Sequence, residues 1–293
     1  MAIDYGELDV RLSELRPRLH RYCARMTGSV IDGEDVAQDA FVKASVRLRD
    51  GEDIANLESW LFKIAHNAAI DFLRKRSRRE ATMSDVDPDL FGDVDEASNN
   101  LDIVAMSLAR FMRLPVVQRG TVILMDVLGY RLRDICDIMD VSLPAAKSAL
   151  HRGRVRLREL ASEPEDTQLP TFSDAQRALL GRYVDRFNAR DFDAIRDMLA
   201  EEVRLDIVNR IRRSGKAQVA SYFTNYANVS DWRLSLGLVD GCLAIIVHDP
   251  ERDVADPTYF MLLEWRNDRV LGIRDFRYAR YVMSDAHVLG LAP

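Results

Sequence analysis

The sequence predicts a multi-domain protein in which two all-α units precede a C-terminal α+β unit. Apolar residues recur at helical spacing through residues 7–79 and again from residue 101 to residue 160. Beyond residue 172, helical segments come first and alternating, strand-like segments follow, which is the order of an α+β domain. We therefore expect a helical unit, an acidic flexible linker, a second helical unit, a short linker and the α+β unit, at residues 1–79, 80–100, 101–160, 161–171 and 172–293.

The composition narrows the class of protein. A net charge of −6 argues against a protein that coats nucleic acid by bulk electrostatics. Cys23, Cys136 and Cys242 lie far apart without nearby histidines, so we expect buried free thiols and neither a disulfide framework nor a zinc site. No apolar run has transmembrane length and the N-terminus has no basic leader, which together predict a soluble protein that stays inside the cell.

The first two helices are predicted from their spacing and end signals. Residues 7–27 form one helix that ends at Gly28, although Pro17 interrupts its first half. In the second helix we expect Asp32 as the N-cap, and an inward face made of Val36, Ala40, Phe41 and Val46. Asp35, Gln38 and Asp39 project together on the outer side, where residue types alone predict only a solvated acidic face.

Residues 56–79 are expected to form a helix with two opposed faces and a basic end. The apolar stripe comprises Leu57, Leu61, Ile64, Ala65, Ala68 and Phe72. Lys63, Asn67, Asp71, Arg74 and Arg78 line the other face, and Trp60 lies at the border between the two. The end carries Arg74, Lys75, Arg76, Arg78 and Arg79, a density of charge that suits a phosphate backbone. Taken alone, this run is more typical of an ordinary amphipathic helix with a solvated basic end than of a helix that binds nucleic acid.

The second helical unit contains a helix-turn-helix pattern. Residues 131–139 predict a short helix, residues 140–142 a turn, and residues 143–160 a longer helix with Ser142 as N-cap and Pro144 in its first turn. The buried side of the longer helix is predicted to be Ala146, Ala149, Leu150, Gly153, Leu157 and Leu160. On its basic side we expect Lys147, Ser148, His151 and Arg152 nearest the bases of a major groove, and Arg154 and Arg158 nearest phosphate.

Three of these segments, in this order, resemble a bacterial RNA polymerase sigma factor of the extracytoplasmic-function (ECF) type. DGEDVAQDAFVKA and SWLFKIAHNAAIDFLRKRSRR resemble sigma region two, a helical bundle. The run that begins at LPVVQRGTV and ends at RGRVRLREL resembles region four, a helix-turn-helix. The resemblance covers residues 10–160 and implies a cytoplasmic, non-enzymatic protein that binds core RNA polymerase, through the β′ clamp helices and the β flap, and promoter DNA.

The resemblance also assigns roles to individual residues. Asp35, Gln38 and Asp39 would dock on core polymerase, and region four would read the minus-thirty-five element. The loop at residues 49–58 would close over one extruded base, and the acidic linker would pass through the polymerase. The residues that would meet the non-template strand of the minus-ten element are Trp60, Lys63, Asn67, Arg74 and Lys75. Neither a cofactor, a metal nor a catalytic residue is implied.

The C-terminal unit is predicted to hold a long helix, a short helix, a strand that begins near Val203, another helix at residues 215–227 and an antiparallel sheet. Its strands are expected at residues 232–239, 242–249, 258–266 and 270–282, and Asn267–Asp268 forms a hairpin turn between the last two. The segments RYVDRFNARDFDAIRDMLAEEVRLDI and YFMLLEWRNDRVLGIRDFRYARYV resemble the cone-shaped SnoaL-like fold over residues 172–285.

The SnoaL-like resemblance leaves two roles open for the C-terminal unit. It implies a sheet curled around a pocket for a small-molecule ligand, and the candidate pocket residues are Asp206, Trp232, Trp265, Asp275 and Tyr278, with His248 nearby. Some relatives use a pocket acid for proton transfer, so one alternative is a small-molecule enzyme or ligand sensor fused to a helix-turn-helix module. The other, which we favour at this point, is a domain that regulates sigma activity in cis. A repressor that uses the helix-turn-helix alone is a third, weaker alternative.

Overall fold

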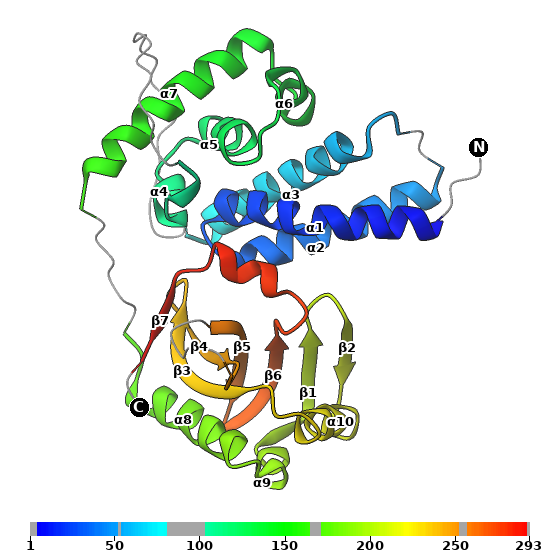
Figure 1. Ribbon diagram of the computed structural model, residues 1–293, viewed down its shortest axis with the longest axis vertical. Coiled ribbons are helices and arrows are strands. Elements are labelled where there is room, and N and C mark those ends of the chain that lie inside the picture. Colours follow the sequence, from blue (N-terminus) through cyan, green and yellow to red (C-terminus); the bar gives the residue numbers. More distant parts are fainter. Residues whose placement is uncertain (1–4, 52–53, 81–102, 165–170, 252–256, 292–293) are drawn as a thin grey trace. The chain divides into compact units, whose positions relative to one another are not determined.

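The computed structural model describes residues 5–51, 54–80, 103–164, 171–251 and 257–291, and the chain forms two compact units, Met1–Asp166 and Thr167–Pro293 (Figure 1). Residues 81–100 of the expected acidic linker and residues 165–170 of the expected second linker lie outside the described residues. The boundaries predicted for the individual domains stay a prediction. The structure places both helical parts in the first compact unit.

The first unit begins with three long helices, α1 (Tyr5–Thr27), α2 (Val30–Arg49) and α3 (Leu57–Glu80). Gly28 has a φ of 83°, a conformation that glycine adopts without strain, and it ends α1 as expected. The predicted N-cap Asp32 is wrong. Ser29 caps α2, because its extended backbone allows its side chain to accept hydrogen bonds from the amides of Ile31 and Asp32.

The inward face of α2 differs from the prediction at one position. Val36, Ala40 and Phe41 are buried, but Val46 is 50% exposed. Ala44 and Leu48 take the inward positions instead, because they follow Ala40 at four-residue spacing along the same face. Gly33 lies where a Cβ atom would come within 2.6 Å of the backbone of Ala24, so α1 and α2 approach closely at this point.

The helix-turn-helix is confirmed. Its helices are α6 (Leu132–Met139) and α7 (Leu143–Ser162). Asp140 makes the turn in the left-handed conformation with a φ of 57°, and the Ser142 side chain caps α7 by accepting from the amide of Ala145. All six residues predicted for the buried side of α7 are buried. Helix α7 packs on α4 (Leu108–Met112), α5 (Val116–Val122) and α6. Two short segments belong to the same part of the chain, η1 (Ile103–Ala105) and the π-helical η2 (Ile123–Val127).

One continuous hydrophobic core joins the two helical parts. Tyr22 of α1, Phe62 of α3, Phe111 of α4 and Leu157 of α7 all belong to it and are fully buried. The predicted apolar stripe of α3 contributes to this core from Leu57 to Ala68, while Phe72 near the basic end is partly buried. Helix α3 packs on α1, α2 and α6, so the helix-turn-helix lies directly against the first bundle.

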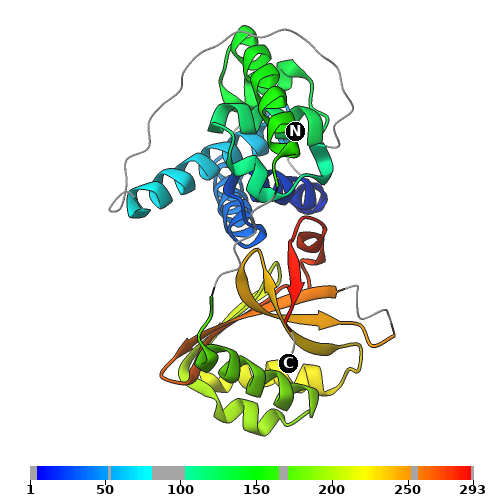
Figure 2. The same ribbon diagram turned by 90° about the vertical axis from the view of Figure 1, so that its left-hand side faces the viewer.

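The second unit is the expected α+β domain. Helices α8 (Asp174–Asn188), α9 (Phe192–Asp197) and α10 (Lys216–Ala227) lie on one side of a curved seven-stranded sheet (Figures 1 and 2). The strand order is β2-β1-β6-β5-β4-β3-β7. The strands are β1 (Leu199–Ile207), β2 (Ile211–Ser214), β3 (Arg233–Val239), β4 (Cys242–His248), β5 (Pro257–Arg266), β6 (Arg269–Asp275) and β7 (Val288–Gly290).

Several details of this sheet correct the prediction. The sheet is mixed, because β1 pairs with β6 in parallel; these strands are far apart in the chain, so no tight turn fixes their relative direction. Strand β1 begins at Leu199, four residues before the expected Val203. The chain leaves the sheet after Asp275 and forms η3 (Arg280–Ser284), where strand had been expected. The short strands β2 and β7 were not predicted, since they have little apolar alternation.

The hairpin between β5 and β6 is confirmed. Asn267 and Asp268 both have positive φ, 47° and 59°, which is the conformation that a two-residue turn between right-twisted strands requires. Inside the domain, aromatic rings from the helices and from the segment before β3 pack edge to face with one another. Phe187 makes such contacts with Phe192, Phe223 and Trp232.

Candidate nucleic-acid interface

The basic face of α3 lies on the surface of the first unit. Lys63, Asn67, Arg74 and Lys75 are exposed, as the helical spacing predicts when the opposite stripe is buried. Trp60 is partly buried and packs against the core, so its ring lies at the border of the two faces as expected. The structure thus brings all five predicted minus-ten residues onto the free side and border of a single helix.

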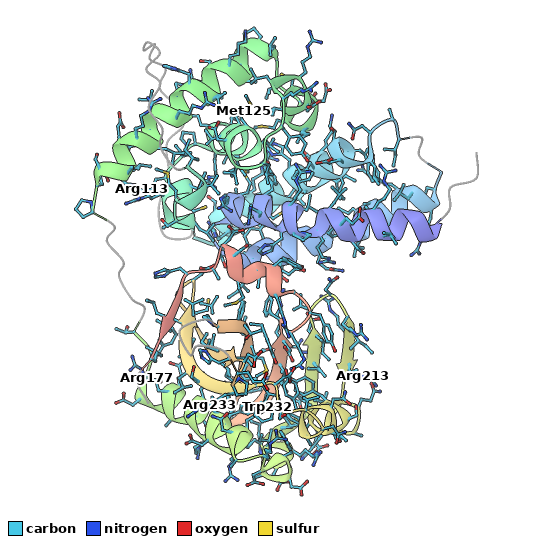
Figure 3. All side chains as sticks on the ribbon, viewed as in Figure 1. Arg113, Met125, Arg177, Arg213, Trp232 and Arg233 are labelled. Carbon is cyan, nitrogen blue, oxygen red and sulfur yellow. The ribbon has the colours of Figure 1, made fainter. Side chains whose placement is uncertain are left out.

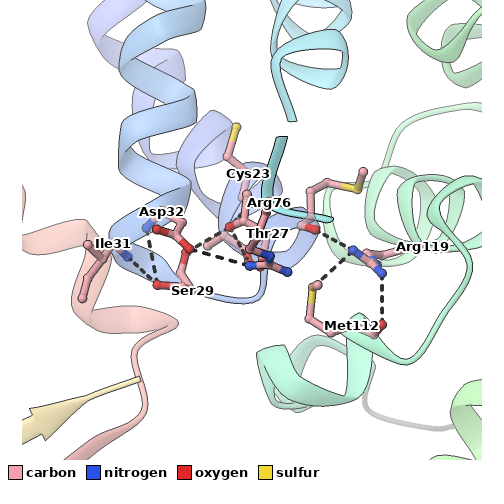
Figure 4. A network of polar contacts seen from close by, with 10 residues as sticks. Cys23, Thr27, Ser29, Ile31, Asp32, Arg76, Met112 and Arg119 are labelled. Atoms are coloured by element: carbon pink, nitrogen blue, oxygen red, sulfur yellow. Dashed lines mark hydrogen bonds and ion pairs between the residues drawn. The ribbon is translucent and has the colours of Figure 1, made fainter. Parts of the chain in front are cut away.

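One arginine of the basic end turns inward. The Arg76 guanidinium donates a hydrogen bond to the carbonyl of Thr27 at 2.9 Å and lies 3.8 Å from the carboxylate of Asp32 (Figure 4). Its charge therefore lies at the C-terminal end of α1, where the helix dipole favours a cation. Arg76 is an anchor of α3 on α1, and the exposed cations of this end are its neighbours Arg74, Lys75, Arg78 and Arg79.

Arg119 joins the helix-turn-helix part to the first bundle. It is 4% exposed, and its guanidinium donates to the carbonyls of Met26 and Leu114 at 2.6 and 2.9 Å. It also donates to the carbonyl of Met112 at 3.0 Å (Figure 4). Burial, and next the positive charge of Arg76, lower the pKa of Arg119 to about 10, so the side chain stays charged at neutral pH. Three carbonyls from three segments are thus satisfied by one planar group.

Glu58 makes a second connection at the N-terminal end of α3. The Tyr130 hydroxyl donates to Glu58 Oε1 at 2.6 Å, and Arg18 of α1 donates both to Glu58 and to the carbonyl of Leu128, the latter at 3.1 Å. Burial and the hydrogen bond to Glu58 raise the pKa of Tyr130. The turn between η2 and α6 therefore lies against the end of α3 that follows the predicted base-capturing loop.

Helix α7 presents the predicted reading residues. Lys147 is exposed, while Ser148, His151, Arg152 and Arg158 are half-buried, and Arg152 donates to the Ser148 hydroxyl at 2.8 Å. Arg154 has a different environment from the one expected for a phosphate contact. It donates two hydrogen bonds to the carboxylate of Asp126, at 3.0 and 2.5 Å, and this bond raises the pKa of Arg154.

The residues predicted to dock on polymerase lie on the outer side of α2. Asp35 and Asp39 are exposed, and Asp39 pairs with Lys43 at 2.7 Å. Gln38 is half-buried, and its side-chain oxygen accepts a hydrogen bond from Arg16 at 2.5 Å. The structure therefore places the two carboxylates at the surface and uses Gln38 to orient an arginine of α1.

Sequence reasoning missed a set of cations that the fold brings to α7. Arg113 and Gln118 come from the chain around the start of α5 and line a groove of about 400 Å³ with His151, Arg152 and Arg156 of α7. Pro115, which precedes α5, was the available signal that a new helix starts there. The distance in sequence between residues 113 and 156 hid their proximity.

In the C-terminal unit, Asp275 is enclosed by the aromatic interior. It is 1% exposed, and its carboxylate accepts from the hydroxyls of Tyr222 and Tyr226 at 2.7 and 2.8 Å and from the amide of Arg277 at 2.8 Å. Burial raises the pKa of Asp275, and the two tyrosine hydrogen bonds oppose that shift. The Tyr183 hydroxyl is buried in the same interior and has no hydrogen-bond partner among the described residues.

The other candidate pocket residues lie elsewhere. Asp206 is opposite Arg274 in the β1–β6 register, so it projects from the face of the sheet opposite to Asp275. It accepts a hydrogen bond from Arg212 and lines a groove of about 480 Å³ on that face. Trp232 is buried in the core, Trp265 packs at its edge, Tyr278 is 49% exposed, and His248 lies 2.8 Å from the Ser235 hydroxyl. The five candidates are thus spread over both faces of the sheet.

Three further observations bear on the composition-based expectations. Cys23 is buried as predicted, but Cys136 is half-buried and Cys242 is exposed, because β4 begins at that residue; no disulfide joins them. No group of three histidine, cysteine, aspartate or glutamate side chains able to hold a metal ion occurs among the described residues. Over the same ranges, no helix has both the length and the apolar character needed to cross a membrane.

Comparison with known families assigns the two helical parts. Residues 12–79 match the family described as Sigma-70 region 2, and residues 108–157 match Sigma-70, region 4. The first part contains α2 and α3, and the second contains the helix-turn-helix. These two regions define the chain as a sigma factor.

Individual relatives narrow the class. The ECF RNA polymerase sigma factor SigM of Mycobacterium tuberculosis is 31% identical over 144 residues, which cover 49% of this chain and 71% of SigM. The ECF RNA polymerase sigma factor SigG of M. tuberculosis is 26% identical over 222 residues, which cover 67% of this chain and 60% of SigG. The crystal structure of the M. tuberculosis extracytoplasmic function sigma factor SigJ covers 91% of this chain and 95% of its own, with 17% identity and a TM-score of 0.36.

The chain belongs to the ECF family of RNA polymerase sigma factors. It spans about 60% of the length of SigG. The second unit adds to the two sigma regions a C-terminal α+β domain with a seven-stranded mixed sheet.

Proposed function

We propose that this protein binds core RNA polymerase and directs transcription initiation at a dedicated set of promoters. The observation that carries the proposal is the presence, in one chain, of α3 with its exposed cationic row and of α7 with its buried stripe and basic outer side. A major groove admits one helix, and Lys147, Ser148 and His151 lie in the first half of α7, where recognition helices contact bases.

Helix α3 is suited to single-stranded DNA. Lys63 and Arg74 supply electrostatic attraction along one side, and Asn67 lies between them with donors and acceptors for a base edge. Trp60 offers the edge of a half-buried ring at the end where the duplex would open, and stacking on such a ring tolerates any base. We infer that α3 captures the non-template strand of the minus-ten element while α7 binds the minus-thirty-five duplex.

Asp35 and Asp39 supply the polymerase-docking surface in this proposal. Both carboxylates are exposed on α2, on the side away from the core. Replacing both with alanine is expected to lower affinity for core RNA polymerase about ten-fold or more, because each charge pair lost at an interface lowers the affinity several-fold. The measurement is titration of labelled core polymerase with the full chain at low salt. Asp137→Ala, an exposed acid of α6, is the matched control.

Initiation itself is tested with genomic DNA of the host, core polymerase and the full chain, by sequencing the 5′ ends of the transcripts. The proposal predicts starts that share two upstream elements and that disappear with Lys63→Ala and Asn67→Ala together. Failure of the folded chain to bind core polymerase at low salt would refute the proposal.

For the C-terminal unit we propose regulation of sigma activity in cis. The rival role, a small-molecule enzyme or sensor, needs a pocket acid within reach of a substrate. Asp275 has the shifted pKa of such an acid, but its carboxylate is enclosed and already accepts three hydrogen bonds. Asp206 is accessible but lies on the opposite face and is paired with Arg212. The arrangement of these acids supports regulation over catalysis.

Deletion of residues 167–293 tests this regulatory role, because it removes the second compact unit and leaves the first. We expect the truncated chain to retain its affinity for core polymerase and to change the yield of transcripts several-fold. The readouts are core-binding titration and quantitative transcription on the same promoters. Equal yields from the truncated and the full chain would contradict a regulatory role.

A further inference from the structure

A cationic groove runs along one flank of α7. It has a volume of about 400 Å³ and is lined on one side by Arg113, Pro115 and Gln118 and on the other by Arg152 and Arg156. Figure 3 shows Arg113 close to the C-terminal part of α7. Three guanidinium groups thus border one open depression, and Gln118 adds an amide that can donate a hydrogen bond.

The groove continues the row of residues expected to face the major groove. Ser148, Arg152 and Arg156 follow one another at four-residue spacing, so they lie along a single line on α7, and Arg152 already donates to Ser148. Arg154 lies on the opposite flank of the helix and is held by both oxygens of Asp126. The arginines of the groove therefore continue the reading face of α7, whereas Arg154 is paired with Asp126 on the other flank.

Two glutamates at the C-terminal end of α7 form ion pairs with two of the groove's three arginines. Glu163 accepts from Arg113 at 2.5 Å and Glu159 accepts from Arg156 at 2.7 Å. All four side chains are between 41% and 55% exposed. Ion pairs this exposed contribute little free energy, so a doubly hydrogen-bonded phosphate can replace them.

We propose that this groove binds a backbone phosphate of the promoter duplex beside the major groove read by α7, with Arg113 and Arg156 as its cations. Glu159 and Glu163 compete with that phosphate from within the chain and lower the affinity of α7 for duplex DNA. The proposal rests on the proposed function and deepens it: it names the phosphate contacts and the acids that weaken them. The occupant fits the site because Arg152 and Arg156 lie one turn apart on α7 and Arg113 lines the same groove, so three positive charges gather where a phosphate backbone would pass.

The experiment measures binding of the full chain to a mixed-sequence duplex by fluorescence anisotropy over a series of KCl concentrations. A phosphate contact is independent of sequence, so the unknown promoter is not needed. Each of Arg113→Ala and Arg156→Ala is expected to weaken binding and to make the slope of log K against log[KCl] shallower by about 0.9. Arg113→Lys keeps the charge and is expected to keep the slope.

The matched control is Arg186→Ala, which removes an equally exposed arginine from an ion pair with Asp191 in the second unit and is expected to leave the slope unchanged. Glu163→Gln is expected to tighten duplex binding about two- to five-fold, because it releases Arg113 without altering the net shape of the groove. Thermal unfolding of each variant confirms that the fold is retained.

An unchanged slope in Arg113→Ala and Arg156→Ala, or weaker binding in Glu163→Gln, would overturn the proposal. Absence of duplex binding by the unsubstituted chain at low salt would overturn it as well. Core polymerase binding, which tests the proposed function, is measured separately, so either inference can fail while the other stands.

Discussion

Buried polar residues connect the helices of the first unit. Arg119 supplies donors to three carbonyls that no other described side chain satisfies in the same place, and the Tyr22 hydroxyl shares a hydrogen bond of 2.6 Å with His66 Nδ1. Both groups are almost fully buried, so water cannot replace either one as the hydrogen-bond partner. Their loss is expected to affect stability far more than any exposed ion pair does.

Arg119→Met tests the first of these groups. The substitution preserves length and burial but leaves the carbonyls of Met26, Met112 and Leu114 without a donor, so we expect a loss of about 3 kcal/mol in the free energy of unfolding of the first unit. Denaturant unfolding of the full chain measures it. Arg133→Met, at an exposed position of α6, is expected to change stability by less than about 0.5 kcal/mol. A loss equal to that of Arg133→Met would contradict the role given to Arg119.

His66 should make the first unit sensitive to acid. Burial lowers the pKa of His66 from 6.5 to about 4, so the unfolded chain binds this proton more readily than the folded chain between those values. Stability is therefore complete above pH 6.5 and is lost as the pH falls, by about 3 kcal/mol at pH 4 from this residue.

The comparison that isolates this effect is His66→Gln, whose amide can accept from Tyr22 but does not titrate. Its unfolding free energy should depend less on pH between 6.5 and 4 than that of the unsubstituted chain. His287→Gln, at an exposed position, should retain the original dependence. A pH dependence that survives in His66→Gln would assign the effect to other groups.

At the scale of elements, two glycines permit close helix packing. Gly33 brings α2 onto α1, and Gly153 brings α7 onto α5. A Cβ atom at residue 153 would lie 2.7 Å from Val122 Cγ2 and 3.3 Å from the carbonyl of Gln118. The position of α7, and with it the groove at Gln118, depends on this absent side chain.

Gly153→Ala is accordingly expected to destabilise the first unit by about 1–3 kcal/mol, because the added methyl group forces α7 away from α5. Gly181→Ala in α8 is a control of opposite sign: the nearest atom to its added Cβ would be Leu236 Cδ1 at 3.9 Å, and helix propensity alone predicts a gain of about 1 kcal/mol. Both values come from denaturant unfolding. Equal effects at the two positions would show that packing at residue 153 is not tight.

At the scale of the whole molecule, each compact unit encloses its own core. Each unit therefore has its own response to pH. The raised pKa of Asp275 means that the folded second unit binds this proton more tightly than the unfolded chain, so this residue favours the folded state in acid and disfavours it as the pH rises through the folded pKa. The pH dependence that Asp275 gives the second unit is therefore opposite to the one that His66 gives the first unit.

Asp275→Asn is predicted to remove this pH dependence from the second unit while leaving that of the first unchanged. The readout is calorimetric unfolding of the full chain from pH 4 to pH 7, with His66→Gln as the reciprocal variant. An effect of Asp275→Asn on the unit that contains His66 would contradict independent cores.

Local patterns in the sequence predicted the long helices and most of the residues that they bury, with Val46 of α2 as the exception. The stripe of α3, the buried side of α7, the Ser142 cap and the Asn267–Asp268 turn depend on neighbours within a few residues, so spacing and turn chemistry predict them. The same local information did not predict the short edge strands or the parallel pairing of β1 with β6. It also missed the N-cap of α2, which is Ser29, three residues before the expected Asp32.

Only the tertiary structure decided which distant residues meet. The sequence by itself determined that this chain has two sigma regions and an α+β domain, and it identified cationic faces on α3 and α7. The fold decided that Arg154 is held by Asp126, that Asp206 and Asp275 lie on opposite faces of the sheet, and that Arg113 borders α7. The physical reason is that side-chain pairing depends on how helices and strands pack across long separations in the chain, and no local period encodes that packing.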